Sequence, residues 1–355
     1  MSTSPLDRDH LRQRVQQALD TFIANQLPTL DAISPELSPL TDALTDLIAG
    51  GKRLRPAFCF WGYRGAGGQD SRALVTAAAA LELFQACALI HDDVMDGSDT
   101  RRGLPAVHRR FASLHRAESW TGDPESFGMG AAVLLGDLCL SWSDEMLATS
   151  GMPAARLLAG HRVYDAMRTE LMGGQYLDLL EQARGGGSVE RALRVARYKS
   201  AKYTIEKPLH LGAVLAGASQ DVLDGYSDYG LPLGEAFQLR DDVLGVFGDP
   251  SVTGKPAGDD LREGKRTALV ALALETATPS QASVVRRHLG DPHLSAGGIE
   301  ALREVIEQTH ALRRVETLID QLMSDALAAL QAAPVDDQAR VVLEELAVAA
   351  TARAL

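Results

Sequence analysis

A long apolar segment that ends in clustered acidic residues restricts the fold of this chain more than any other feature. Residues 73–90 are apolar and rich in alanine, and they contain neither proline nor glycine. Such a segment predicts a long helix buried in a protein core. Asp92, Asp93 and Asp96 follow it, and Asp92 and Asp96 are one helical turn apart. Because carboxylates crowded at the end of a buried helix repel one another, we expect a cation between them.

The acidic segment indicates a site for magnesium and diphosphate. Magnesium in proteins commonly binds one or two carboxylates together with the phosphates of a substrate. Arg101 and Arg102 follow one loop later and offer positive charge to such phosphates. A solvated acidic helix end is the alternative that a single motif of this kind leaves open.

The composition predicts one all-α domain spanning residues 1–355. The chain is 46% hydrophobic but only 5% aromatic, and it is rich in alanine and leucine, which favours helices over sheets. No repeat, strand pair or interdomain linker is apparent. The net charge of −12 argues against a nucleic-acid-binding protein, which presents a basic face.

Neither an export signal nor a membrane span is expected. The N-terminal residues are polar, and no run approaches the roughly 18 uninterrupted apolar residues of a membrane span. Cys59, Cys87 and Cys139 fit no metal-binding spacing, so we expect reduced, buried thiols. These features predict a cytoplasmic protein.

Apolar periodicity predicts further helices at 8–26, 40–48, 128–146, 156–180 and 221–247. Prolines are expected to interrupt this pattern: Pro28 and Pro35 after the first helix, and Pro208 as a kink in a later one. A loop is expected at 251–264, and helices alternating with turns at 267–355.

Two further segments carry charges suited to polyanionic substrates. The glycines at 50 and 51 end one helix and Pro56 can begin the next, which places Lys52 and Arg55 near a helix N-terminus, where anions bind. Asp241 and Asp242 form a second acidic pair on an apolar helix. If the two acidic helices pack face to face, their carboxylates line one cavity, ringed by Lys52, Arg55, Arg101, Arg102, Lys202, Lys255 and Lys265.

These segments together resemble the trans-isoprenyl diphosphate synthases, the polyprenyl synthetase family that includes farnesyl and geranylgeranyl diphosphate synthases. The resemblance covers about residues 51–267. Its elements in chain order are the GKxxRP segment 51–56, the first aspartate-rich motif 92–96 with Arg101-Arg102-Gly103, the GQxxD segment 174–178, the second aspartate-rich motif 238–242, and Gly254-Lys255 and Gly264-Lys265 of a closing loop. Six elements in this order are far more specific than one acidic motif.

The resemblance implies a class I isoprenoid synthase fold, with antiparallel helices around a deep central cavity, in a homodimer. It implies condensation of isopentenyl diphosphate with an allylic diphosphate. Asp92, Asp96 and Asp241 would bind Mg²⁺, with three ions per site expected, and Asp93 and Asp242 would support them. The allylic diphosphate would be held by Arg101, Lys202 and Lys255, and isopentenyl diphosphate by Lys52, Arg55, Gln85 and Arg102. Gln175 and Gln238 would line the cavity, and Lys265 would help to close it.

Two positions depart from the family pattern. Gly245 stands where the family has the third aspartate of its second motif, and Asp249, one turn later, is a candidate replacement. Tyr203 stands after Lys202 where the family often has threonine, which puts that contact to the allylic substrate in question.

The first acidic helix is also expected to set the product length. Ala88 and Cys87 are small, whereas bulky residues at these positions stop growth at fifteen carbons in the family. Phe84 is the first large side chain further down the helix and either ends the product cavity or packs in the core. We therefore expect geranylgeranyl diphosphate, with farnesyl or longer polyprenyl diphosphates as alternatives.

Three other classes of protein remain as alternatives. A class I terpene cyclase has no need of Lys52 and Arg55 and carries a different second metal motif. A non-catalytic subunit that modulates a synthase is expected to lose an aspartate-rich motif. A di-iron bundle needs two Glu-x-x-His pairs, whereas this chain has one, Glu307 and His310.

Overall fold

The structure, a computed structural model, describes residues 5–185, 187–248 and 258–351. Its contacts divide the chain into two compact units: Met1–Phe60 with Gln69–Leu158, and Trp61–Gly68 with Ala159–Leu355. The described residues are helical almost throughout, which confirms the all-α prediction. A single domain spanning residues 1–355 stays a prediction.

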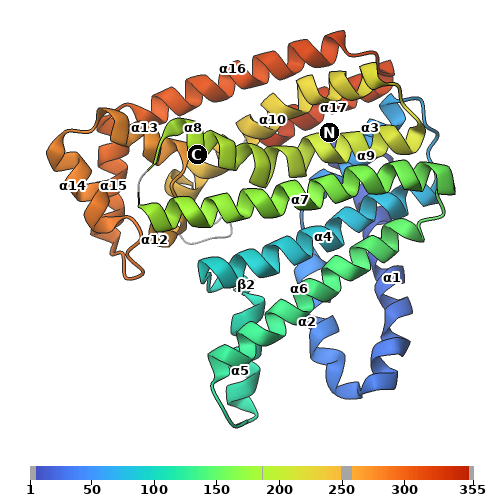
Figure 1. Cartoon of the computed structure of the whole chain (residues 1–355), viewed down its shortest axis with the longest axis horizontal. Coiled ribbons are helices and arrows are strands. Elements are labelled where there is room, and N and C mark those ends of the chain that lie inside the picture. The colour runs from blue at the N-terminus through green and yellow to red at the C-terminus, as the bar shows by residue number, and fades with distance from the viewer. Residues whose placement is uncertain (1–4, 186, 249–257, 352–355) are drawn as a thin grey trace. The chain divides into compact units, whose positions relative to one another are not determined.

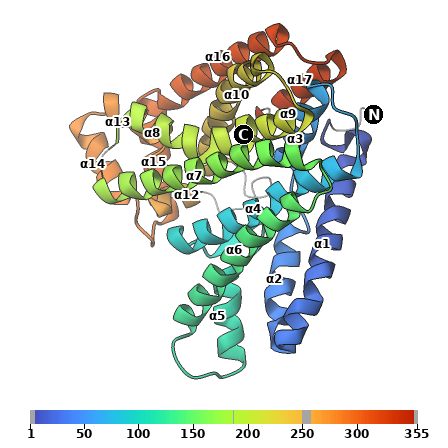
Figure 2. The ribbon, with the colours of Figure 1, turned by 45° about the vertical axis from the view of Figure 1, so that its right-hand side comes forward.

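The first unit is built on two long antiparallel helices, α4 and α6, which lie side by side (Figures 1 and 2). Its elements are η1 (Pro5–His10), α1 (Leu11–Ile33), η2 (Pro35–Leu37), α2 (Ser38–Ile48), the start of α3 (Leu54–Gly65), α4 (Arg72–Asp96), β1 (Thr100–Arg101), β2 (Leu104–Pro105), α5 (Val107–Ala117) and α6 (Pro124–Ala148).

Helix α4 is the predicted buried helix, and it includes all three aspartates of the first motif. It begins after Ser71, whose hydroxyl accepts a hydrogen bond from the Leu74 amide (3.1 Å), and it ends at Gly97 in the left-handed conformation. Both α4 and α6 are long and apolar enough to cross a membrane. In α4, 72% of the apolar window is buried, as in the core helix of a globular protein, compared with 39% in α6.

Helix α1 corrects the prediction that the first helix stops before Pro28. It continues through this proline to Ile33. A proline inside a helix leaves the carbonyl four residues earlier without its usual donor. Ala24 and Pro28 are both exposed, so water can hydrate that carbonyl, and the break is avoided.

A two-residue strand pair, which the sequence did not predict, connects α4 to α5. Thr100 pairs with Pro105 and Arg101 with Leu104 in an antiparallel register. The turn residues Arg102 and Gly103 both have positive φ (55° and 77°), as a type I′ turn requires. The ribbon is short, but it fixes the backbone on which Arg101 and Arg102 are carried.

The second unit contains the remaining helices. They are α7 (Ala154–Arg184, from Ala159 onward), α8 (Val189–Val195), the π-helix η3 (Ala196–Glu206), α9 (Lys207–Ala216), α10 (Gln220–Phe247), α12 (Asp259–Glu263), α13 (Ala268–Thr276), α14 (Pro279–His288), α15 (Ala296–Gln308), α16 (Ala311–Ala332) and α17 (Asp337–Thr351). Helix α12 lies inside the predicted loop 251–264, of which residues 251–257 are outside the described residues. Helices α10 and α16 lie side by side (Figure 1).

The predicted kink at Pro208 is instead a change of helix type. Pro208 occupies the first turn of α9, and the irregular backbone precedes it as the π-helix η3. Helix η3 packs tightly on two neighbours: a Cβ on Gly174 of α7 would lie 2.5 Å from the Lys199 nitrogen, and one on Gly234 of α10 would lie 2.5 Å from the Ala201 Cα. Wide helical turns of this kind often mark functional sites.

The three cysteines are free and buried, as predicted. Burial, with a smaller contribution from the charge of Asp137, raises the pKa of Cys87 to about 12. All three thiols therefore behave as small apolar core groups.

Candidate active site

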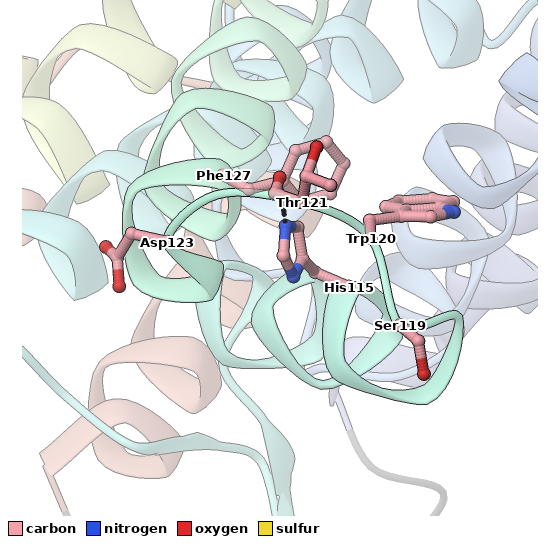
Figure 3. A pocket seen from close by; sticks show the side chains of 6 residues that line it. All are labelled: His115, Ser119, Trp120, Thr121, Asp123 and Phe127. Atoms are coloured by element: carbon pink, nitrogen blue, oxygen red, sulfur yellow. Dashed lines mark hydrogen bonds between the residues drawn. The ribbon is translucent and has the colours of Figure 1, made fainter.

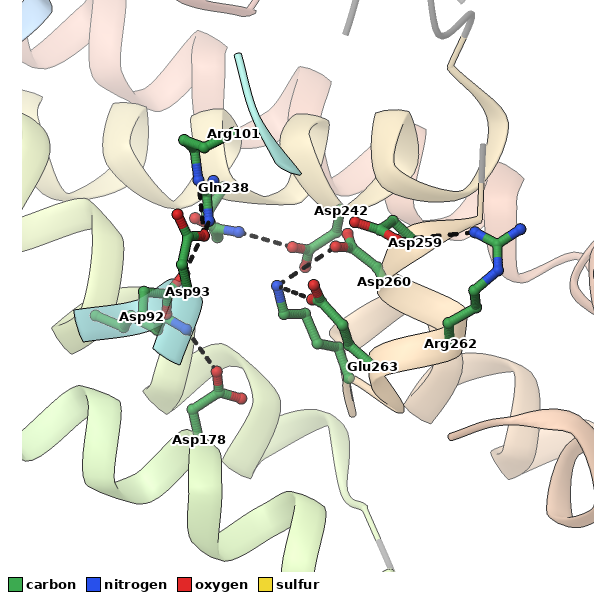
Figure 4. A network of polar contacts seen from close by, with 12 residues as sticks. Asp92, Asp93, Arg101, Asp178, Gln238, Asp242, Asp259, Asp260, Arg262 and Glu263 are labelled. Atoms are coloured by element: carbon green, nitrogen blue, oxygen red, sulfur yellow. Dashed lines mark hydrogen bonds and ion pairs between the residues drawn. The ribbon is translucent and has the colours of Figure 1, made fainter. Parts of the chain in front are cut away.

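The first aspartate-rich motif occupies the last two turns of α4, in the first unit. Arg101 binds the buried Asp93 through Nε (2.9 Å to Oδ1) and also through Nη2 (Figure 4). The same Nη2 lies 3.6 Å from Asp92 Oδ2. The ribbon after α4 thus brings Arg101 back to the motif, and Asp93 anchors it there.

The position of these aspartates on the helix favours a cation. A helix carries partial negative charge at its C-terminus, which is unfavourable for carboxylates in the last turns. No three Asp, Glu, His or Cys side chains within the described ranges converge as a ready-made metal site. Magnesium completed by phosphate oxygens needs only one or two carboxylates, and Asp92 and Asp96, one turn apart, fit that requirement.

The predicted isopentenyl diphosphate residues all belong to the first unit as well. Lys52 is exposed, Arg55 is half-buried in the first turn of α3, and Gln85 is half-buried on α4. Arg102 reaches this turn and donates from Nη1 to the carbonyls of Leu47 (2.7 Å) and Gly50 (3.1 Å). Burial lowers the pKa of Arg102, and the charges of Arg53, Arg101 and Arg55 lower it further against the opposing effect of Glu82.

The three residues predicted to set product length differ in exposure. Ala88 is half-buried on the same face of α4 as Gln85 and Asp92, whereas Cys87 and Phe84 are buried. The small residue at 88 therefore lies on the partly open face of α4 that also carries Gln85 and Asp92, two of the predicted site residues. Whether Phe84 ends a product cavity or belongs only to the core stays a prediction.

The second aspartate-rich motif lies near the C-terminal end of α10, in the second unit. Gln238 Nε2 donates to Asp242 Oδ1 (2.7 Å; Figure 4). Burial raises the pKa of Asp242 well above its usual value, and the charges of Asp260 and Asp241 add to this effect. The Gln238 hydrogen bond and Lys265 oppose it. Asp241 is half-buried. Asp242 is thus the buried carboxylate of the pair, and Asp241 is the more open one.

A carboxylate from α12 fills the space beside Gly245. A Cβ on Gly245 would lie 1.8 Å from Asp260 Oδ2, so no larger side chain fits there without displacing Asp260. Lys265 Nζ lies 3.4 Å from Asp260 Oδ1 and 2.7 Å from Glu263 Oε2. Asp260 therefore brings a carboxylate to the place of the missing third aspartate. Asp249, the predicted replacement, and Lys255 lie outside the described residues.

Two lysines of η3 have different carboxylate partners. Lys199 Nζ binds Asp178 Oδ2 (2.7 Å), so it joins the GQxxD segment of α7 that also carries the half-buried Gln175. Lys202 Nζ binds Glu170 Oε1 (2.9 Å) and Glu206 Oε2 (3.3 Å). Burial lowers the pKa of Lys202, but these carboxylates outweigh it and the net pKa is raised.

Lys199 was not among the predicted substrate-binding residues. Its contact with Asp178 joins residues 21 positions apart on two different helices, and no sequence spacing signals it. Gly174 permits this contact, because only a residue without a side chain lets the η3 backbone approach α7 so closely.

A pocket at the turn between α5 and α6 is lined by residues that hold this turn together. The rings of His115, Trp120 and Phe127 pack edge to face or tilted at its wall, with centroids 5.2–5.9 Å apart (Figure 3). His115 Nε2 lies 3.2 Å from the Thr121 carbonyl oxygen, and Asp123 accepts a hydrogen bond from the Ser126 amide at the start of α6. These contacts hold the turn together, and none of the motif residues takes part in them.

The two units thus carry one aspartate-rich motif each, with basic residues beside it. The first unit brings together Arg101 with Asp92 and Asp93, and Arg102 with the turn that carries Lys52 and Arg55. The second brings together Gln238, Asp242, Asp260 and Lys265. The predicted face-to-face arrangement of the two motifs stays a prediction.

Comparisons with known proteins identify the family. The polyprenyl synthetase family model matches residues 38–306. Geranylgeranyl diphosphate synthase of Methanosarcina mazei is 35% identical over 260 residues, covering 71% of this chain and 75% of the relative. Geranylfarnesyl diphosphate synthase of Aeropyrum pernix is 33% identical over 296 residues, covering 81% and 86%.

A solved structure agrees over nearly the whole chain. The crystal structure of geranylgeranyl pyrophosphate synthase from Corynebacterium glutamicum, complexed with isoprenyl diphosphate and magnesium, superposes with a TM-score of 0.94. The two chains are 43% identical, and the match covers 98% of this chain and 99% of the other. With the family model and the motifs in agreement, the chain belongs to the polyprenyl synthetase family and is a trans-prenyltransferase with an isoprenoid synthase fold.

Proposed function

We propose that this prenyltransferase makes geranylgeranyl diphosphate by adding isopentenyl diphosphate to a shorter allylic diphosphate. The observation that carries the product length is the α4 face, where small, half-buried Ala88 lies one turn from Asp92 and bulky Phe84 lies one turn further. Similarity to geranylgeranyl diphosphate synthases from two organisms supports the same product. Similarity to the Aeropyrum pernix geranylfarnesyl diphosphate synthase supports a longer product as the alternative.

The site residues divide between the two substrates. Lys52, Arg55, Gln85 and Arg102, which all lie in the first unit, would hold isopentenyl diphosphate. Arg101, anchored on Asp93, would hold the allylic diphosphate, together with Lys202 or Lys199 and with Lys255. Gln175 and Gln238 would face the developing cation, and Lys265 would help to close the site. Fixed cations stabilise charge on the departing diphosphate without reorganising during the reaction.

We propose that Asp92, Asp96 and Asp241 hold Mg²⁺, with three ions per site. Their position near the C-terminal ends of α4 and α10 supports this, since helix dipoles make those ends electronegative. When bound, magnesium neutralises the diphosphate and promotes its departure as a Lewis acid. Asp260, which fills the space beside Gly245, would add negative charge to the second motif.

The remaining chemistry needs little from side chains. The double bond of isopentenyl diphosphate attacks the allylic carbon, and a proton then leaves the condensed product. We propose the departed diphosphate as the acceptor of that proton. An apolar surround that excludes water protects the cation until the new bond has formed.

We propose a cytoplasmic homodimer. The exposed side of α6 carries Phe127, Met129, Val133 and Leu134, with exposed fractions of 39%, 48%, 40% and 66%. An apolar face of this kind on one helix commonly marks a protein–protein interface. A second copy of the chain, packed on α6, would cover it.

Product analysis tests the proposed reaction. The purified chain with Mg²⁺, isopentenyl diphosphate and farnesyl diphosphate should yield a twenty-carbon diphosphate, and chelation with EDTA should abolish turnover. The five- and ten-carbon allylic diphosphates should be extended to the same length. A hydrocarbon formed from geranylgeranyl diphosphate alone would indicate a terpene cyclase instead, and no turnover by the isolated chain would indicate a modulating subunit.

Phe84→Ala tests the floor of the product cavity. Removing the ring should shift the products beyond twenty carbons, as measured by chain-length analysis of the dephosphorylated alcohols. The same change should lower the free energy of unfolding by about 3–5 kcal/mol, because Phe84 is buried. A less stable variant with an unchanged product distribution would assign Phe84 to the core alone.

Alanine variants of Lys199 and Lys202 distinguish their roles. Lys202→Ala leaves the buried Glu206 with less compensating charge. The free energy of unfolding of this variant should therefore be about 3 kcal/mol lower than that of the wild type. Lys199→Ala leaves the buried Asp178 with less compensating charge, so it should lose stability as well, but it should also lower kcat/KM for the allylic substrate by about a hundredfold. If Lys202→Ala lowers kcat/KM for the allylic substrate and Lys199→Ala does not, the substrate contact belongs to Lys202.

Leu134→Glu tests the proposed dimer interface. A charge at the most exposed apolar residue of α6 should shift the sedimentation coefficient from that of a dimer to that of a monomer. Asp137→Glu, on the same helix, serves as a control that keeps the surface charge. A wild-type chain that sediments as a monomer would exclude the homodimer.

A further inference from the structure

A buried ion pair lies beneath the turn that carries Lys52 and Arg55. Arg53 Nη1 binds Glu82 Oε2 of α4 at 2.5 Å, and the two side chains are only 4% and 5% exposed. Arg53 Nη2 binds Gln16 Oε1 of α1 (2.5 Å) and the carbonyl oxygen of Ile48 at the end of α2. One guanidinium thus joins three helices to the turn.

The backbone of this turn is held in a conformation that an arginine rarely adopts. Arg53 has φ of 57°, in the left-handed region. Such a conformation costs a residue with a side chain of order 1 kcal/mol, so it persists only where surrounding contacts determine it. The side-chain contacts of Arg53 with Glu82, Gln16 and Ile48 hold the backbone in this conformation. Because Lys52 precedes Arg53 and Arg55 follows it by two residues, the direction of both depends on this conformation.

The ion pair also has electrostatic neighbours in the same unit. The positive charges of Arg53, Arg55 and Arg101 act on Arg102, and the negative charge of Glu82 opposes them. Glu82 lies three residues before Gln85 on α4, so the two side chains are neighbours on the helix, and Gln85 is one of the proposed isopentenyl diphosphate residues. A buried carboxylate beneath an anion-binding site weakens anion binding through its field. The field of Glu82 therefore does not help the site to bind an anion, and its contribution has to be structural.

We propose that the Arg53–Glu82 ion pair is a positioning device for the isopentenyl diphosphate site. It fixes the turn 50–53 so that Lys52 and Arg55 meet the diphosphate in the correct geometry. The inference rests on the proposed assignment of these residues to isopentenyl diphosphate. Arg53 and Glu82 themselves are buried and act through the residues they position.

Glu82→Gln separates positioning from electrostatics by the sign of its effect. Glutamine keeps the shape of the side chain but loses the charge. If the field of Glu82 dominated, its removal would tighten the binding of a diphosphate. If Glu82 positions the turn, the dissociation constant and KM for isopentenyl diphosphate should rise roughly ten- to a hundredfold, and KM for farnesyl diphosphate should stay within about twofold. A role in stability alone would lower Tm and leave both constants unchanged.

The experiment combines calorimetric titration of isopentenyl diphosphate with steady-state kinetics on the full chain. Arg53→Lys keeps the positive charge but loses some of the hydrogen bonds of the guanidinium group. The dissociation constant and KM for isopentenyl diphosphate should therefore rise, but less than in Glu82→Gln. Arg53→Lys also decides the question if Glu82→Gln does not fold. Asp46→Asn is the matched control, because Asp46 on α2 forms an equally short but exposed ion pair with Arg110 (2.5 Å). This variant should bind as wild type.

The outcomes separate the inference from the proposed function. A wild-type chain that neither binds isopentenyl diphosphate nor forms product would overturn both. A wild-type chain that does both, with variants that bind isopentenyl diphosphate as tightly or more tightly, would overturn the inference alone. Equal losses for both substrates would also overturn it.

Discussion

Repulsion between carboxylates at the negative ends of two helices governs the arrangement of charge in this protein. The first motif closes α4, and the second lies near the end of α10. Each unit partly compensates its own motif, with Arg101 on Asp93 in one and Lys265 beside Asp260 in the other. The remaining demand for positive charge suits magnesium, which commonly binds one or two carboxylates together with phosphate oxygens.

Sequence reasoning succeeded where local rules determine structure. Apolar periodicity and helix-ending glycines predicted α2, α4, α6, α7 and α10, and the spacing of Asp92 and Asp96 placed both on one face. It failed where solvent or tertiary packing decides. Water permits Pro28 inside α1, and packing between α7 and α10 accompanies the π-helix η3. The strand pair escaped notice because two residues per strand leave no alternation to detect.

The second motif illustrates the difference between a pattern in sequence and an arrangement in space. Gly245 breaks the family pattern, and the sequence pointed to nearby Asp249 as its replacement. In the structure, Asp260 of α12 occupies the vacated volume, from 15 residues further along the chain. The contact between Lys199 and Asp178 is of the same kind. Both contacts join residues from different helices, so a motif within one segment of the sequence cannot predict them.

The ribbon at 100–105 directs two adjacent arginines to different parts of the first unit, and the proposed assignment gives them different substrates. Arg101 turns back to the aspartates of α4, whereas Arg102 reaches the carbonyls at 47 and 50. Because both side chains are arginines, the left-handed turn determines that Arg101 and Arg102 point in different directions. Inserting one residue before it would move Arg101 to the place of Arg102, and a different residue would then stand beside Asp93. In this ribbon, the number of residues therefore matters together with their identity.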